Sequence, residues 1–198
     1  MTATDAGFEE RGDSEFLFDF DQFERMDQVG VFSGVQGRVE LIEGKIIQMA
    51  PASTDHGGAN ADVVFAIESA LRALSPRPAL KVIVNATLQI GQRSAPLPDV
   101  FVMRRAEGEK YAQAEQAVLV VEISISTRGN DLTVKSRLYA RAGVPEYWVV
   151  EPNARKVSVC REPQADGTWA STAVFEGNAA TVSPLFAPQI SIALSELF

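Results

Sequence analysis

The chain has 198 residues, 46% of them hydrophobic, and a formal net charge of −8. This length predicts one domain, and the hydrophobic content excludes a disordered chain. The acidic balance argues against nonspecific nucleic-acid binding, which usually needs a basic excess, although a local basic cleft stays possible. No apolar run approaches the roughly 20 residues of a membrane span, so we expect no membrane partner.

The N-terminal residues are polar and acidic, and they lack the apolar segment of a signal peptide. We expect residues 1–14 to form a disordered tail and residues 15–198 to fold as a single domain. The single cysteine, Cys160, excludes an internal disulfide and a zinc site built from cysteines. Together these features predict a cytoplasmic protein.

Hydrophobic patterning in the first half predicts a hairpin and a helix. The turn Glu43-Gly44 between two apolar runs is the usual hairpin signal. Apolar residues at helical spacing follow, and a proline-rich segment ends them. We expect a short helix at 16–26, hairpin strands at 38–42 and 45–49, a helix at 58–74, and strands at 80–84 and 87–90.

The second half alternates strands with one helix. The run 117–123 is apolar at nearly every position, which predicts a strand covered on both faces of a sheet. We expect strands at 99–103 and 117–123, a loop at 126–130, a helix at 131–142, strands at 147–150, 156–160 and 169–175, and a closing helix at 190–197. This order predicts an α/β fold, with helices flanking a mixed β-sheet and an N-terminal β-hairpin.

One carboxylate interrupts the most apolar expected strand. Glu122 lies between Val121 and Ile123, and a buried carboxylate must be paired or bind metal. Asp99 heads another strand of the same sheet, and two such acids could share Mg²⁺, which prefers oxygen ligands. That arrangement would hold a water and a phosphate oxygen for hydrolysis. The alternatives are a buried pair of Glu122 with an arginine and a turn-capping role for Asp99.

Three further side chains are candidates for the same site. Glu40 lies in the first hairpin strand, Lys135 lies on the second long helix, and Ser124 shares a strand face with Glu122. Carboxylates suit a hard cation, and an ammonium group suits developing anionic charge. The alternatives are a solvent-facing Glu40 and an exposed helix ion pair between Lys135 and Asp131.

His56 is the single histidine, and it lies just before the first long helix. One histidine cannot make a histidine-rich zinc site, and a surface or capping role competes with a catalytic one. No phosphate-cradling glycine-rich motif follows a strand, so we expect no nucleotide cofactor.

Several segments together resemble the Uma-two family of restriction-endonuclease-like proteins, within the PD-(D/E)XK nuclease superfamily. They are 39–46, Pro98-Asp99-Val100, 120–124, and the most specific group, Asp131-Leu132 with Lys135, Tyr139 and 142–148. The resemblance covers about residues 16–198. It implies a restriction-endonuclease-like core and Mg²⁺-dependent phosphodiester hydrolysis, with Mn²⁺ as an alternative ion.

The resemblance also implies roles for particular residues. By motif, Asp99 and Glu122 match the two metal-binding acids, and Glu40 matches the acid that precedes them. The superfamily usually has a lysine two residues after the second acid, where this chain has Ser124. Lys135, on the following helix, is the candidate replacement.

These residues lead to the expectation of a Mg²⁺-dependent DNA endonuclease. Glu40 would hold a second metal ion or orient water, and Lys135 would stabilise negative charge. His56 matches a histidine often found in the family after the first hairpin, and Arg128 and Arg137 are candidates for phosphate contact. We expect a homodimer, because symmetric dimers are the commonest closed assembly.

Two other functions compete with this one. The acidic net charge and the absent in-line lysine favour a nuclease-fold binding or assembly module without turnover. Hydrolysis of another phosphodiester, such as RNA, is the third candidate. The apolar residues Leu194, Leu197 and Phe198 could form either a dimer interface or part of the core.

Overall fold

The structure is a computed structural model that describes residues 15–104, 108–125 and 129–198, without the side chains of 129–132. The expected tail at 1–14, most of the expected loop at 126–130 and the candidate Arg128 lie outside the described residues. No helix in the described part of the chain is long and apolar enough to cross a membrane.

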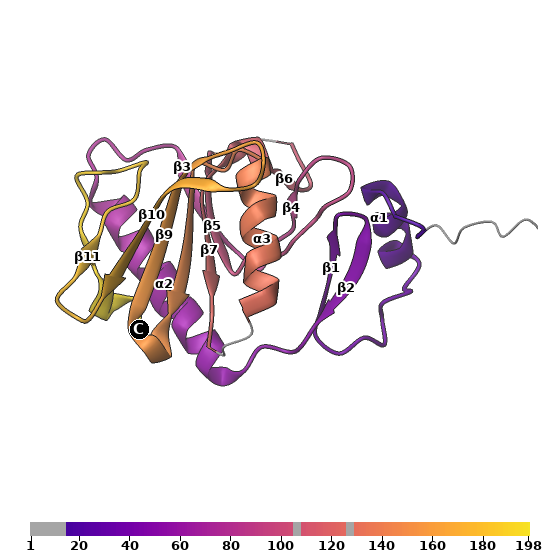
Figure 1. Cartoon of the computed structure of the whole chain (residues 1–198), viewed down its shortest axis with the longest axis horizontal. Helices are drawn as coiled ribbons and strands as arrows, with labels where there is room; N and C mark the ends of the chain where they lie inside the picture. The colour runs from indigo at the N-terminus through magenta and orange to yellow at the C-terminus, as the bar shows by residue number, and fades with distance from the viewer. Residues whose placement is uncertain (1–14, 105–107, 126–128) are drawn as a thin grey trace, which may run out of the picture.

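A mixed sheet forms the centre of the molecule (Figure 1). It has six strands in the order β10-β9-β8-β7-β5-β3. Within this sheet β7 and β8 pair in parallel, and the other neighbours are antiparallel. A parallel pair needs a crossover connection, which helix α3 (Gly129–Arg141) supplies between β7 and β8. The strands are β3 (Leu80–Val84), β5 (Val100–Arg104), β7 (Ala117–Ile123), β8 (Glu146–Glu151), β9 (Lys156–Pro163) and β10 (Trp169–Glu176).

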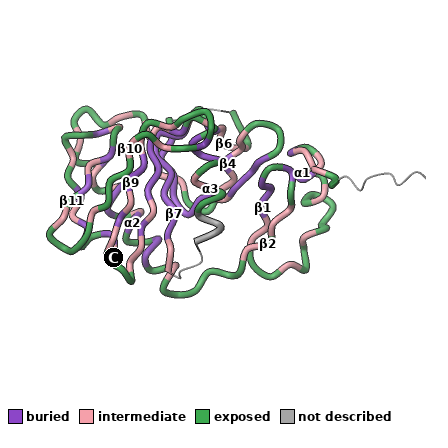
Figure 2. The backbone as a smooth tube through the Cα atoms, in the orientation of Figure 1, coloured by how far each residue is buried: buried purple, intermediate pink, exposed green. Residues whose placement is uncertain are grey.

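Two helices, α2 (Thr54–Ala73) and α3 (Gly129–Arg141), cover opposite faces of this sheet. Ile67 of α2 belongs to the same core cluster as Val121. Tyr139 of α3 instead packs in the cluster of Val120. Because successive strand residues point to opposite faces, β7 is covered on both sides, and all seven of its residues are buried (Figure 2). The mixed α/β fold and the doubly covered strand are confirmed.

The predicted hairpin is confirmed, and it lies apart from the main sheet. Strands β1 (Arg38–Ile42) and β2 (Lys45–Met49) lie with helix α1 (Phe20–Gln28) at one end of the molecule (Figure 1). Glu43 and Gly44 have φ angles of 50° and 83°, as a two-residue hairpin turn with two positive φ angles requires. The hairpin is joined to the loop before β5 through the N–H of Ala95, which donates to the carbonyl of Leu41 at 2.7 Å.

The closing helix expected at 190–197 is wrong. This segment forms the short strand β12 (Ile192–Ala193), which pairs with β11 (Thr181–Val182), followed by one 3-10 turn, η3 (Leu194–Glu196). Leu194 and Leu197 are completely buried in the main core. These residues are apolar because they pack in the core, and core residues can belong to a strand or a turn as well as to a helix.

Smaller differences concern the ends of elements. Helix α2 begins at Thr54, four residues before the expected start, because the Ser53 hydroxyl accepts the His56 N–H and caps it. The strand expected at 87–90 is reduced to β4 (Leu88–Gln89), which pairs with β6 (Ala112–Gln113). Two more 3-10 turns are present, η1 (Ala114–Gln116) and η2 (Pro152–Ala154).

Candidate active site

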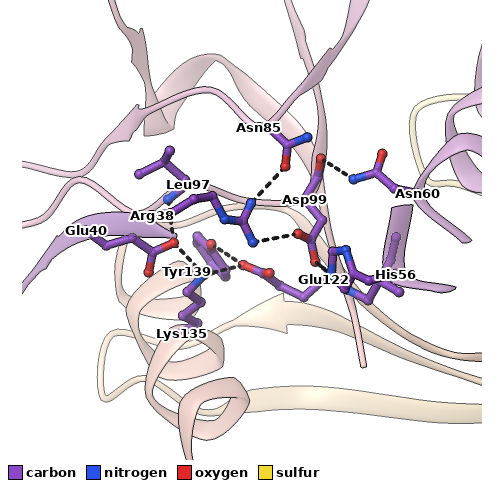
Figure 3. A network of polar contacts seen from close by, with 11 residues as sticks. Arg38, Glu40, His56, Asn60, Asn85, Leu97, Asp99, Glu122, Lys135 and Tyr139 are labelled. Carbon is purple, nitrogen blue, oxygen red and sulfur yellow. Dashed lines mark hydrogen bonds and ion pairs between the residues drawn. The ribbon is translucent and has the colours of Figure 1, made fainter. Parts of the chain in front are cut away.

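A cleft of about 440 Å³ lies where the hairpin, α2, α3 and the end of β7 meet. Five of the candidate residues line it: His56, Asp99, Glu122, Ser124 and Lys135. Arg38 lines it as well, and Glu40 is connected to it through Lys135 (Figure 3). Residues far apart in the sequence thus form one polar network.

Strand pairing places the two central acids side by side. Val100 of β5 is paired with Val121 of the antiparallel β7. Asp99, which directly precedes β5, therefore lies next to Glu122 at the end of β7. Ser124 follows the end of β7, lines the same cleft, and donates its backbone N–H to the carbonyl of Val150 at 2.8 Å.

The Asp99 carboxylate is held by three donors. Its Oδ1 accepts from Arg38 Nη2 at 3.2 Å, and its Oδ2 accepts from the Ile123 N–H at 2.9 Å and from His56 Nε2 at 3.1 Å. Burial would raise the pKa of Asp99, but these donors outweigh it and hold the pKa below its usual value. Asp99 is therefore a carboxylate at neutral pH.

The His56 ring faces Asp99 instead of solvent, and its side chain is 17% exposed. Ser53 provides the helix cap, so His56 has neither the surface role nor the capping role that competed with a site role. The hydrogen bond to Asp99 is the main cause that raises the pKa of His56 above its usual value, and burial opposes it.

Lys135 connects the other two carboxylates. Its Nζ lies 2.9 Å from Glu40 Oε1 and 3.2 Å from Glu122 Oε1. Glu40, Glu122 and Lys135 are only 0%, 4% and 6% exposed. This burial excludes the two alternatives, a solvent-facing Glu40 and an exposed helix ion pair of Lys135.

Tyr139 completes the surroundings of Glu122. It follows Lys135 by four residues, which places both side chains on one face of α3. The Tyr139 hydroxyl donates to Glu122 Oε1 at 2.8 Å. Across the site, the Leu97 N–H donates to Glu40 Oε1 at 3.0 Å.

Burial raises the pKa of Glu122 to about 7, with Lys135 opposing the rise and the charges of Asp99 and Glu40 adding to it. Burial would lower the pKa of Lys135, but the combined attraction of Glu122 and Glu40 raises it above its usual value. The site therefore keeps a permanent ammonium ion, and a further cation in the cleft would favour the ionised form of Glu122.

The donor set fits a hard divalent cation held by few protein ligands. No group of three histidine, cysteine or acidic side chains among the described residues is placed to hold a metal ion. Mg²⁺ is commonly bound by one or two carboxylates, with waters and substrate oxygens completing its shell. Asp99 and Glu122 supply two such carboxylates at one cleft.

Two site residues were missed in the sequence. Arg38 is two residues before Glu40 and so shares its strand face, and Tyr139 is one helical turn after Lys135. These two spacings were the signals in the sequence from which Arg38 and Tyr139 could have been found. Arg137, expected near the cleft, is exposed and does not line it; its Cβ lies next to Gly167, in the turn between β9 and β10.

Comparison with known proteins agrees with this fold. The model of the Uma2 family, described as "Putative restriction endonuclease", matches residues 20–195, and the chain therefore belongs to that family. A solved structure of a "putative nuclease belonging to DUF820" from Anabaena variabilis is similar with a TM-score of 0.68 and 22% identity, over 91% of this chain and 97% of that one. A search of curated proteins found no match.

Proposed function

We propose that the chain is a Mg²⁺-dependent endonuclease that hydrolyses phosphodiester bonds in DNA. One observation carries the proposal: two carboxylates from adjacent strands, Asp99 and Glu122, line one cleft beside the buried ammonium group of Lys135. Membership of the Uma2 family supports the choice of a nuclease.

Asp99 and Glu122 are the residues that would hold Mg²⁺ or Mn²⁺. A bound ion of this kind lowers the pKa of a water molecule and neutralises charge on a phosphate oxygen. The residues around the two acids prepare them for this role. Arg38 and His56 keep Asp99 ionised, and the contacts of Lys135 and Tyr139 favour the ionised form of Glu122.

Lys135 has an electrostatic role in this proposal. Because its pKa is raised, it remains an ammonium ion and cannot act as a general base. It lies at a cleft wall, where a fixed positive charge stabilises negative charge that develops on a phosphate. Glu40 positions Lys135 through the 2.9 Å contact. Glu40 Oε2 is buried without a hydrogen-bond partner among the described residues, and in this proposal it would hold a second ion or orient water.

The remaining expected participants belong to the same proposal. Ser124 lines the cleft near Glu122, where its side chain would contact substrate. Arg137 does not line the cleft and would contact phosphates only outside it. Arg128, which lies outside the described residues, stays a candidate for phosphate contact. Cutting both strands of a duplex would require two copies of the site, which a homodimer supplies.

A plasmid-cleavage assay with the full chain tests this proposal. We expect nicking or linearisation in Mg²⁺ or Mn²⁺, none in EDTA, and a large loss in Asp99→Asn. Glu115→Gln, at an exposed position in η1, is the control for removing one acidic charge. Cleavage that persists in Asp99→Asn would contradict the proposal. RNA and a small phosphodiester, assayed in parallel, distinguish DNA hydrolysis from a wider activity.

A binding module without turnover is the second candidate. It is favoured by the ion pairs that already occupy the carboxylates: Arg38 and His56 on Asp99, and Lys135 on Glu122. Such a module would bind Mn²⁺ weakly and would not cleave any of the three substrates. Tight Mn²⁺ binding that Glu122→Ala abolishes would exclude it.

A further inference from the structure

Arg38 is the most exposed charged side chain that contacts the two-carboxylate site. It begins β1, outside the main sheet, and reaches Asp99 across 61 positions of sequence. Nη2 lies 3.2 Å from Asp99 Oδ1, and Nη1 donates to Asn85 Oδ1 at 2.8 Å. The side chain is 26% exposed and lines the cleft. Arg38 can therefore move toward solvent without unpacking the core.

The orientation of Asp99 does not depend on Arg38. The other carboxylate oxygen is fixed by the Ile123 N–H and by His56. The Asp99 carbonyl also accepts from the side chain of Asn60 at 3.3 Å and from the N–H of Asn85 at 3.2 Å. What Arg38 adds at Oδ1 is chiefly a positive charge.

The two permanently charged cations among the described site residues, Lys135 and Arg38, differ in how firmly they are held. Lys135 is buried and contacts two carboxylates at 2.9 and 3.2 Å. Arg38 contacts one carboxylate at 3.2 Å, and its Nε is buried without a hydrogen-bond partner among the described residues. Because Arg38 has a single carboxylate contact and an unpartnered donor, a competing cation can displace it at lower cost than Lys135.

We propose that Arg38 is the resident cation of Asp99, and that a divalent ion must displace its guanidinium from Oδ1 in order to bind. This inference rests on the proposed function, because it assumes that Asp99 is a metal ligand. Arg38 then sets the metal affinity of the site. While no ion is bound, Arg38 keeps the Asp99 carboxylate paired. Once an ion has displaced it, Arg38 remains at the cleft, where it can contact a phosphate.

Removal of this charge has a predictable sign. A unit charge and a divalent ion about 6 Å apart repel by roughly 1.4 kcal/mol even in water, which corresponds to about tenfold in affinity. Arg38→Met should therefore bind Mn²⁺ more tightly than the wild type by that factor. Arg38→Lys keeps the charge and should remain close to the wild type.

Calorimetric titration of Mn²⁺ into the metal-free full chain tests the inference. The matched control is Arg141→Met, which removes an exposed arginine–carboxylate pair between α3 and Glu43 of the same hairpin. We expect tighter binding in Arg38→Met alone. If circular dichroism finds that Arg38→Met is not folded, Arg38→Gln replaces it.

Each outcome has one meaning. Equal or weaker Mn²⁺ binding by a folded Arg38→Met would overturn the role of Arg38 and leave the proposed function standing. Absence of binding in both the wild type and Arg38→Met would overturn both proposals. Binding that occurs only in Arg38→Met would support Arg38 as a competitor and show that it blocks the wild-type site.

Discussion

Two buried glutamates on neighbouring strands have opposite surroundings. Glu146, at the start of β8, is completely buried, and both of its oxygens have donors. Oε1 accepts from Arg161 Nε at 2.8 Å and Nη2 at 2.6 Å, and Oε2 accepts from the Leu185 N–H at 2.7 Å. Glu122, on β7, instead lines a cleft of about 440 Å³ beside a second carboxylate.

The difference separates a structural acid from a candidate catalytic one. Arg161 also donates to the Ser183 carbonyl at 2.6 Å, so the fully paired Glu146 joins β8 and β9 to the C-terminal segment. The pKa of Glu122 is raised to about 7 by burial. A buried carboxylate is thus not itself a mark of function; its access to a cleft beside a second carboxylate is.

The largest expected effect is on activity. Glu122→Gln preserves shape but removes a charge from the cleft, and we expect DNA cleavage to fall by about 10² to 10³. Glu146→Gln should keep cleavage near the wild-type rate at temperatures where it is folded. Initial rates of plasmid nicking, measured for both variants after circular dichroism, make the comparison. Similar losses in the two variants would erase the distinction.

The effects on stability should have the reverse order, with a larger loss for a substitution of Glu146 than for one of Glu122. Glu146→Ala leaves Arg161 without its carboxylate, and removing one partner of a buried pair costs about 3 kcal/mol or more. The 30% exposure of the Arg161 side chain places the value near that lower end. Glu122→Ala should cost less, because Lys135 keeps its contact with Glu40. Urea unfolding of the metal-free proteins measures both, and a larger loss in Glu122→Ala would contradict the comparison.

The next effect is a pH dependence of stability that the raised pKa of Glu122 should cause. Its folded pKa of about 7 is above the ordinary 4.5, so between these values the folded state holds a proton that the unfolded state releases. The free energy of unfolding should therefore fall as pH rises through this window, by up to about 3 kcal/mol.

Unfolding in EDTA at pH 5 and pH 8 checks this expectation in the wild type and in Glu122→Gln. The raised pKa of His56 contributes a decline of the same sign and persists in the variant. Glu122→Gln should thus show a shallower decline than the wild type. An unchanged slope would mean that Glu122 is already ionised at pH 5.

The smallest effect compares two neighbouring tyrosines, whose rings lie 5.3 Å apart. Tyr139→Phe loses the hydrogen bond to Glu122 and should cost about 1 to 2 kcal/mol. Tyr147→Phe is the matched control, because the Tyr147 hydroxyl is buried without a partner among the described residues. It should be neutral or slightly stabilising in urea unfolding. A greater loss in Tyr147→Phe would show that the polar contacts at Glu122 are weak.

Local patterns predicted the elements that carry the site. The Glu43-Gly44 turn placed the hairpin, and the unbroken apolar run around Glu122 indicated a strand covered on both faces, as the burial of β7 confirms. A carboxylate within such a run had to be compensated, which is why Glu122 could be selected from the sequence. Its partner Asp99 followed from the expectation that both strands belong to one sheet.

Contacts between distant segments could not be predicted in the same way. Arg38 and Asp99 are 61 residues apart, and only the docking of the hairpin against the loop before β5 brings them together. The burial of Lys135 likewise depends on Glu40, 95 residues away. Without that docking, Glu40 on its strand and Lys135 on its helix have the pattern of exposed residues. The prediction of a closing helix at 190–197 failed for the same reason, because the apolar residues of this segment are placed by packing in the core.

The most direct test of the central claim is an anomalous-difference map from a crystal of the wild-type protein soaked in Mn²⁺. We expect a peak in the cleft in contact with the carboxylates of both Asp99 and Glu122. A cleft without a peak, or a peak that contacts neither acid, in a crystal where Mn²⁺ reaches the cleft would contradict the assignment of these two residues as the metal-binding pair.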